Sequence, residues 1–181
     1  NMGYTLAGAL EALRKLCEYG IIYAEQPVAS IEDMAALRFA IAKEGLPARI
    51  AADESIRKAE DPLKVARANA ADLMVIKAAP LGGVRRALAL VEQAQLPAVV
   101  SSALESSVGI GVGASLAASL PTLRYGCGLG TVSLMAEDVT DEPLIARDGF
   151  MDLRTITPSP QRLERLATDE QTRQWWVERV T

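Results

Sequence analysis

The chain has 181 residues, half of them hydrophobic, with 19 basic and 23 acidic residues and a formal net charge of −4. This composition supports a sizeable buried core and differs from that of a disordered chain. No basic cluster with interleaved aromatic residues occurs, so we expect no nucleic-acid partner. No apolar run approaches the roughly 18 residues of a membrane span, and no signal-peptide pattern opens the chain, so we expect a cytoplasmic protein with no membrane partner.

Histidine is absent from the sequence. Catalytic triads that rely on imidazole and zinc sites with histidine ligands therefore cannot be built from this chain. The two cysteines, Cys17 and Cys127, are isolated and lack the spacing of a metal site. We expect them to be small buried hydrophobic residues in a reducing compartment.

Helical and extended patterns alternate over the first 131 residues. Apolar residues at helical spacing precede Gly20, which is typical of a helix end. Ser30 before two acidic residues predicts a helix start, and so does Asp61 before Pro62. The expected helices lie over about 5–19, 31–44, 62–70, 84–95 and 108–120, and the extended segments over 21–27, 48–53, 72–77, 98–102 and 123–131.

The extended segments end at regular intervals. Glu25, Asp53, Lys77, Ser101 and Gly126 are separated by 28, 24, 24 and 25 residues, and each interval fits one strand, one loop and one helix. Such units form either an open doubly wound parallel sheet or a closed βα barrel. We favour the barrel because polar side chains end consecutive strands, where barrel reaction sites lie. Since five units do not close an eight-unit barrel, we expect its other strands to come from residues outside this sequence.

The pattern changes beyond Thr131. Residues 134–143 are acidic and loop-like, and one helix is predicted from about Ser159 to Val180. We expect its paired tryptophans, Trp175 and Trp176, to be core or contact residues rather than a ligand cage. The fold class is therefore α/β, with barrel units over 1–133 and a tail over 134–181 that packs on them.

A buried-looking apolar strand ends at Lys77. A lysine in that position loses hydration, which favours its neutral form and makes it a candidate proton acceptor. The same stretch is equally compatible with a lysine that pairs with a carboxylate or extends to the rim of the sheet.

Two carboxylates, Glu25 and Asp53, end neighbouring predicted strands and would face the same mouth. Their mutual repulsion would raise a pKa unless a cation lies between them. Oxygen ligands without His or Cys favour a hard ion such as Mg²⁺, although each carboxylate could instead pair with a nearby Lys or Arg. Together with Lys77, the pair indicates a divalent ion that stabilises an enediolate and a lysine that exchanges a proton beside a carboxylate.

Five motifs mark the predicted strand ends. They are Tyr23-Ala24-Glu25-Gln26-Pro27, Ala52-Asp53-Glu54-Ser55, Ile76-Lys77 followed by Gly82-Gly83, Ser101-Ser102 with Glu105-Ser106-Ser107, and Gly128-Leu129-Gly130-Thr131. As a spaced set they resemble the enolase superfamily, and within it the actinobacterial dehydratases of menaquinone biosynthesis. The resemblance implies a modified (β/α) barrel, here only its C-terminal part, and a tail that joins a capping domain.

The resemblance also implies roles for individual residues. Glu25 and Asp53 match two of three Mg²⁺ ligands, and Lys77 matches the lysine that stabilises the enediolate or, in racemising relatives, acts as second acid/base. The third ligand and the base lysine of a Lys-x-Lys motif would fall before Asn1. Substrate contacts are implied for Glu54, Ser106, Ser107, Gly128, Gly130 and Thr131. For the serines and glycines, helix capping and tight turns are the alternative interpretation.

The activity that this resemblance implies is a Mg²⁺-assisted syn-dehydration of a small carboxylate substrate. A racemase of N-succinylamino acids or a dipeptide epimerase remains an alternative, because the same residues would serve either reaction. A non-catalytic or phosphate-binding barrel, with the segment from Gly128 to Thr131 around an anion, is an alternative of another class. The sequence leaves the oligomeric state open.

Overall fold

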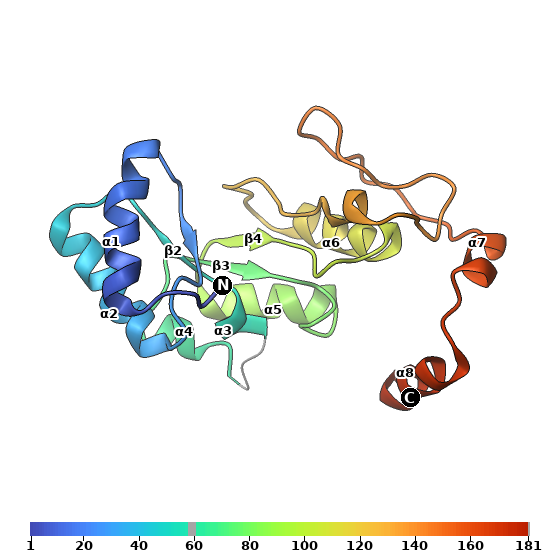
Figure 1. The fold of residues 1–181 in the computed structure, drawn as a ribbon, viewed down its shortest axis with the longest axis horizontal. Helices are drawn as coiled ribbons and strands as arrows, with labels where there is room; N and C mark the ends of the chain where they lie inside the picture. The colour runs from blue at the N-terminus through green and yellow to red at the C-terminus, as the bar shows by residue number, and fades with distance from the viewer. Residues whose placement is uncertain (58–60, 181) are drawn as a thin grey trace.

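A computed structural model describes residues 1–57 and 61–180, and only the backbone at position 180. In this part of the chain, parallel strands form one sheet in the order β1-β2-β3-β4. The strands are β1 (Ala24–Glu25), β2 (Ile50–Ala52), β3 (Leu73–Ile76) and β4 (Ala98–Val100). Spatial neighbours are also neighbours in sequence, as successive βα units require. The predicted alternation of strands and helices is confirmed (Figure 1).

The register of the sheet brings the predicted strand ends to one edge. Glu25 lies opposite Ala51, whereas Asp53 and Lys77 each follow the last residue of their strand. The segment predicted as a strand over 123–131 is reduced to a single parallel bridge between Ser101 and Gly128. Glycines weaken a strand because they lose more backbone entropy on folding and have no side chain to pack. The glycines at 126, 128 and 130 therefore explain this shortening.

Helices connect the strands and cover one face of the sheet. Ser30 caps the helix that follows it, since its Oγ accepts the N–H of Asp33 at 2.9 Å, and this cap was predicted. The predicted helix start at Asp61 is wrong: the helix begins at Lys64, and the Asp61 carboxylate pairs with Arg67 instead. The helices of this region are α1 (Leu6–Leu16), η1 (Cys17–Tyr19), α2 (Ile31–Glu44), α3 (Glu54–Arg57), α4 (Lys64–Arg67), α5 (Val84–Ala94), α6 (Ser107–Ser119) and η2 (Thr131–Leu134).

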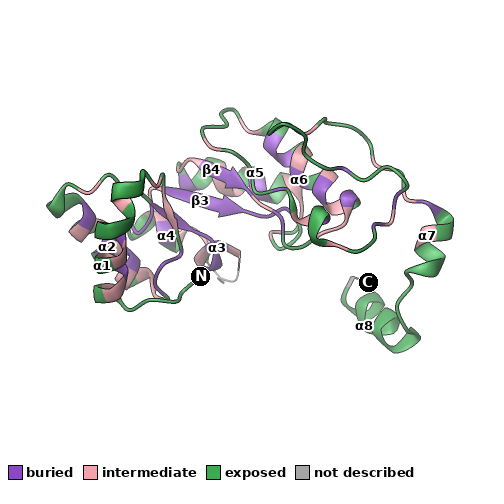
Figure 2. Cartoon of the chain, turned by 45° about the horizontal axis from the view of Figure 1, so that its top comes forward, coloured by how far each residue is buried: buried purple, intermediate pink, exposed green. Residues whose placement is uncertain are grey.

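The core lies between the sheet and these helices, and Figure 2 shows the buried residues gathered there. Alternate strand residues point to the opposite face, where they form a second apolar cluster. Burying a side chain such as Leu or Ile contributes about 1.5–3 kcal/mol each. The second cluster consists of Ala51, Leu73, Val75 and Val99, with Tyr23 and Tyr125 packed against it.

The tail differs from the prediction of one helix. It contains two, α7 (Pro160–Arg165) and α8 (Glu170–Val180), because Asp169 accepts the N–H of Thr172 at 2.8 Å and starts a new helix. In Figure 1, α8 lies away from the sheet. Trp175 and Trp176 stack edge to face with ring centroids 4.8 Å apart, but they are exposed rather than in the core. The division of the chain at residue 133 stays a prediction.

Neither cysteine is fully buried. Cys127 is exposed and Cys17 is only partly buried, so the prediction that both are buried is wrong. Cys127 lies in the glycine-rich segment that forms only one bridge to β4, so few neighbours cover its thiol. Among the helices of the described ranges, none is long and apolar enough to cross a membrane.

Candidate active site

A buried ion pair joins the ends of β2 and β3. Lys77 Nζ donates to Asp53 Oδ1, and the two side chains are only 9% and 6% exposed. Charged side chains are rarely buried this far, and burying a pair costs hydration that its attraction does not always repay. Pairing of Lys77 with a carboxylate was one of the interpretations that the sequence allowed, and the structure shows that the partner is Asp53.

The short helix α3 adds a second cation and a second carboxylate. Arg57 Nε lies 3.3 Å from Asp53 Oδ1, and Arg57 Nη2 donates to Glu54 Oε1 at 2.9 Å. Burial alone would lower the pKa of Arg57, but the charges of Asp53 and Glu54 raise it overall. Glu54 Oε2 is buried and has no hydrogen-bond partner among the residues that the structure describes. A buried oxygen without a donor costs free energy, and such atoms commonly mark a place where a ligand or ion binds.

Glu25 completes the group of carboxylates at this edge. Partial burial raises its pKa, the neighbouring charge of Asp53 raises it further, and Lys77 partly opposes this effect. Among the described residues, the cations near Glu25 therefore do not fully offset its burial and the charge of Asp53. A cation bound between Glu25 and Asp53 would remove the remaining repulsion.

These residues fit a magnesium site in which the protein supplies only a few of the ligands. Mg²⁺ binds oxygen ligands, usually through one or two carboxylates, and fills its other positions with water and substrate oxygens. Glu25 and Asp53 supply such a pair. In the ranges that the structure describes, no three or more Asp, Glu, Cys or His side chains form a complete metal cluster.

The predicted serines of α6 serve a different contact in this structure. Ser106 is the residue before the helix, and Ser107 is fully buried. Ser107 Oγ accepts the N–H of Leu144 at 2.7 Å, and its own N–H donates to Asp138 Oδ1 at 3.1 Å. Both partners belong to the tail, so Ser107 joins α6 to the tail. A substrate contact for either serine stays a prediction.

The glycine segment runs beside the end of β4. Gly128 N–H donates to Val100 O at 2.8 Å, and a Cβ at Gly128 would lie 2.9 Å from Ser101 Oγ. Thr131 Oγ1 is 2.8 Å from Ser102 Oγ, whereas Gly130 is exposed. The glycine at 128 therefore permits close approach to β4, and contact of this segment with substrate stays a prediction.

Two residues of the site were not singled out from the sequence. Arg57 follows Asp53 by four residues, a helical spacing that could have signalled the pair. Gln26 is completely buried beside Glu25, and its side-chain oxygen accepts the N–H of Asp53 at 3.2 Å. A polar residue between a strand-end carboxylate and a proline was the available signal for Gln26.

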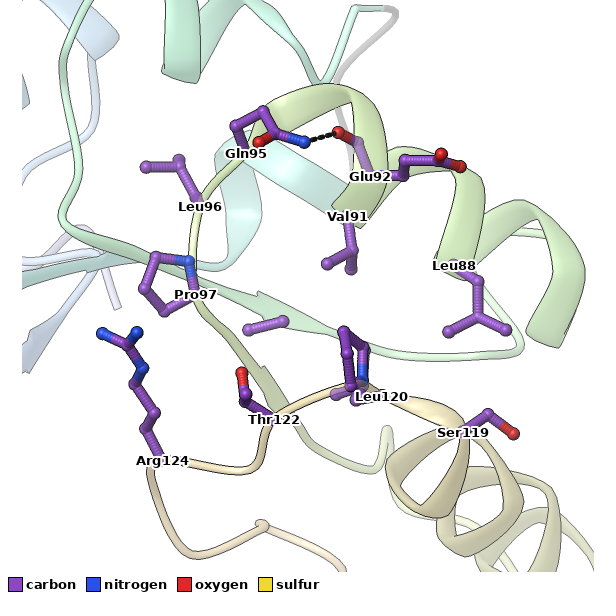
Figure 3. Close-up of a pocket in the computed structure, with 12 residues that line it drawn as sticks. Leu88, Val91, Glu92, Gln95, Leu96, Pro97, Ser119, Leu120, Thr122 and Arg124 are labelled. Carbon is purple, nitrogen blue, oxygen red and sulfur yellow. Dashed lines mark hydrogen bonds between the residues drawn. The ribbon is translucent and has the colours of Figure 1, made fainter.

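A cavity of about 550 Å³ lies elsewhere, between α5 and α6 (Figure 3). Leu96 and Pro97, which line it, precede β4, so the cavity is at the amino end of that strand. Its charged side chains, Glu92 and Arg124, are exposed. Because barrel chemistry gathers at the carboxyl ends of strands, we do not assign the active site to this cavity.

Comparisons with known proteins identify the family of this chain. The profile of the family described as "Enolase C-terminal domain-like" matches residues 1–158. Proteins named o-succinylbenzoate synthase are similar: that of Mycolicibacterium smegmatis is 52% identical over 99% of this chain and 54% of its own length. The one from Mycobacterium tuberculosis strain H37Rv is 49% identical over the same shares. The chain thus spans about half the length of these relatives.

Solved structures with the same fold include two cycloisomerases. The muconate lactonizing enzyme from Pseudomonas putida has a TM-score of 0.80 and 28% identity, covering 93% of this chain and 48% of its own. The 2-chloromuconate cycloisomerase from Rhodococcus opacus 1CP has a TM-score of 0.81 and 29% identity, covering 93% and 47%. The predicted superfamily and the α/β barrel class are confirmed. Enzymes of this superfamily are generally Mg²⁺-dependent.

Proposed function

Because the chain belongs to the enolase C-terminal domain-like family, we propose that it carries the strand-end half of an o-succinylbenzoate synthase site. The proposed reaction is the syn-dehydration of 2-succinyl-6-hydroxy-2,4-cyclohexadiene-1-carboxylate. The observation that supports it most is the buried contact of Lys77 with Asp53, beside the incompletely compensated Glu25. The proposed cofactor is Mg²⁺, held by Glu25 and Asp53.

The chain's own residues have distinct parts in this proposal. When bound, Mg²⁺ would neutralise negative charge on the substrate carboxylate. Asp53 holds the Lys77 ammonium at the mouth, where its charge stabilises the enediolate formed as the alpha proton leaves. Arg57 forms a second ion pair with Asp53 and helps to hold the carboxylate in position. The base that removes the proton is proposed to lie in the part of the relatives that this chain does not span.

The burial of this group supports electrostatic stabilisation as its main contribution. Lys77 and Asp53 are almost fully covered, and charge interactions are stronger where water is excluded. An ammonium already positioned in such a place needs no reorganisation when charge develops on the substrate. The half-exposed Glu25 leaves a route by which a small carboxylate could reach the pair.

The proposal is tested with Glu25→Gln and Asp53→Asn in the full-length protein. Each variant should weaken Mg²⁺ binding measured by calorimetry and abolish most dehydration of the cyclohexadiene substrate, because each removes one of the charged ligands proposed for the metal. Glu44→Gln is the matched control, since Glu44 pairs with Arg14 at the surface. Wild-type protein that binds no Mg²⁺ through Glu25 and Asp53 would contradict the proposal and favour the phosphate-binding or non-catalytic barrel.

The same preparations separate the other reaction on this scaffold. A racemase of N-succinylamino acids or a dipeptide epimerase would exchange the alpha proton of its substrate with solvent deuterium. Exchange on N-succinylamino acids or dipeptides without dehydration of the cyclohexadiene would replace the synthase assignment. The metal-binding roles of Glu25 and Asp53 would be unaffected by that outcome.

A further inference from the structure

Gln26 has an unusual backbone at the end of β1. It follows Glu25, is 0% exposed and has φ of 37°, in the left-handed region that residues other than glycine rarely adopt. Such a conformation persists only where surrounding contacts hold it, and it is common beside functional groups. Gln26 N–H donates to Ala51 O at 2.8 Å, so the backbone remains tied to β2 as it turns.

The Gln26 amide connects β1 to the start of α3. Its Oε1 accepts two backbone N–H groups, those of Asp53 and Ser55, each at 3.2 Å. Its Nε2 donates to Val28 O at 3.1 Å and to Ser55 Oγ at 2.9 Å. The two N–H donors decide which end of the amide is the oxygen, because a nitrogen there would face them donor to donor. The Gln26 side chain therefore joins the end of β1 to the backbone N–H groups of Asp53 and Ser55 at the start of α3.

The chemistry of an amide suits this position. A glutamine supplies an oxygen with two lone pairs and two N–H donors without net charge. A cation here would compensate Glu25 and Asp53 and compete with a metal, whereas a third anion would add repulsion. Since Glu25 and Asp53 come from different strands, their separation depends on what links β1 to the end of β2.

We propose that Gln26 is a positioning residue that sets the spacing of Glu25 and Asp53 for a divalent cation. This inference rests on the proposed function, because it assumes that the two carboxylates bind Mg²⁺. Partners of metal ligands usually affect metal affinity by about 10- to 100-fold when they are removed. The Gln26 amide acts through the backbone of Asp53 and does not itself contact the metal or the substrate.

The test is Gln26→Met in the full-length protein. Methionine has a similar length and no donor or oxygen, so it removes the amide contacts and retains most of the volume. The dissociation constant of Mg²⁺, measured by calorimetry without substrate, should rise about 10- to 100-fold. Gln93→Met is the matched control, because Gln93 is exposed on α5 and should leave Mg²⁺ affinity unchanged.

A second variant keeps the inference testable if Gln26→Met does not fold. Ser55→Ala removes one acceptor of Nε2 and leaves both N–H donors to Oε1, so it should weaken Mg²⁺ binding in the same direction by a smaller factor. A folded Gln26→Met or Ser55→Ala protein with lower stability and unchanged Mg²⁺ affinity would show a purely structural role and overturn the inference. Wild-type protein without Mg²⁺ binding at Glu25 and Asp53 would instead refute the proposed function itself.

Discussion

Two polar networks occupy opposite ends of the strands, and they differ in how completely their atoms are paired. At the amino end, Asp72 Oδ1 accepts Arg38 Nε at 2.7 Å, and Asp72 Oδ2 accepts the N–H of Ile50 at 2.8 Å. Arg38 Nη1 also donates to Asn69 O at 3.1 Å. Each oxygen of this carboxylate has a donor, so the network joins α2 to the sheet and leaves little attraction for a ligand.

The carboxyl-end network uses similar groups with a different result. Asp53 is paired with Lys77 and Arg57, yet Glu54 Oε2 has no donor within the described ranges, and the pKa of Glu25 is raised. A charged group whose hydrogen bonds are all made within the protein gains little from a ligand. A group that is left partly unpaired carries a free-energy penalty, and a ligand that pairs with it removes that penalty and so binds favourably. Pairing, more than burial or residue type, separates the structural network from the candidate active site.

The largest effect is expected from Lys77→Ala in the full-length protein. Turnover should fall by at least about 100-fold, because a preorganised charge near the developing enediolate is lost. Mg²⁺ affinity should not weaken, since Lys77 competes with the metal for Asp53. Steady-state kinetics and calorimetry measure the two quantities. Lys64→Ala, at an exposed pair with Glu32, is the control, and wild-type turnover in Lys77→Ala would remove Lys77 from the site.

The next largest effect is expected at the other network, and on stability instead of activity. Asp72→Ala removes the partner of Arg38 and of the Ile50 N–H and should lower the free energy of unfolding by about 2 kcal/mol. Denaturant titration measures this loss, and turnover per folded molecule should stay at the wild-type value. Asp61→Ala, at an exposed pair with Arg67, should change neither quantity. A loss of turnover without a loss of stability would reverse the roles assigned to the two networks.

The smallest expected effect concerns pH and Glu25. Partial burial and then the charge of Asp53 hold its pKa above the ordinary value, so the group favours the folded state below its unfolded pKa and loses that contribution as pH rises. Without Mg²⁺, Glu25→Gln should therefore gain stability relative to wild type between about pH 4 and pH 7, with no difference at acid pH. Unfolding titrations in EDTA across this range provide the measurement.

Glu44 provides a control whose pKa shift has the opposite sign. A hydrogen bond from Arg14 lowers the pKa of Glu44, so Glu44 stabilises the fold above its unfolded pKa and loses this contribution as pH falls. Glu44→Gln should therefore lose stability relative to wild type as pH rises over the same range. Parallel pH profiles for Glu25→Gln and Glu44→Gln would show that folding does not raise the pKa of Glu25.

Much of the fold could be predicted because it depends on local patterns. Buried apolar runs predicted β2, β3 and β4, and Ser30 predicted the start of α2 by its capping chemistry. The tail shows where local patterns compete. Apolar spacing continues from α7 into α8, but the chain leaves the helix after α7, and Asp169 accepts the N–H of Thr172 where α8 begins. Thr168-Asp169 was the available signal for this break.

The candidate site could be predicted only in part. The strand ends placed Glu25, Asp53 and Lys77 at one edge, because side chains that follow parallel strands share that edge. Which of them contact one another depends on rotamers and on residues distant in sequence, and the direct pairing of Lys77 with Asp53 could not be read from spacing. The position of Gln26 carried a signal, but its contacts with Asp53 and Ser55 could not be predicted, because they join segments distant in sequence and accompany a positive φ.

The order of the strands also governs how the sheet can assemble while the chain is being synthesised. β1, β2, β3 and β4 adjoin one another in the order in which they leave the ribosome. Each strand from β2 to β4 therefore meets a partner that already exists, and pairing closes the loop of one βα unit, which costs less entropy than a longer loop would. Growth through these strands can proceed in chain order without undoing earlier pairs, and nascent β4 is the edge that awaits the next segment.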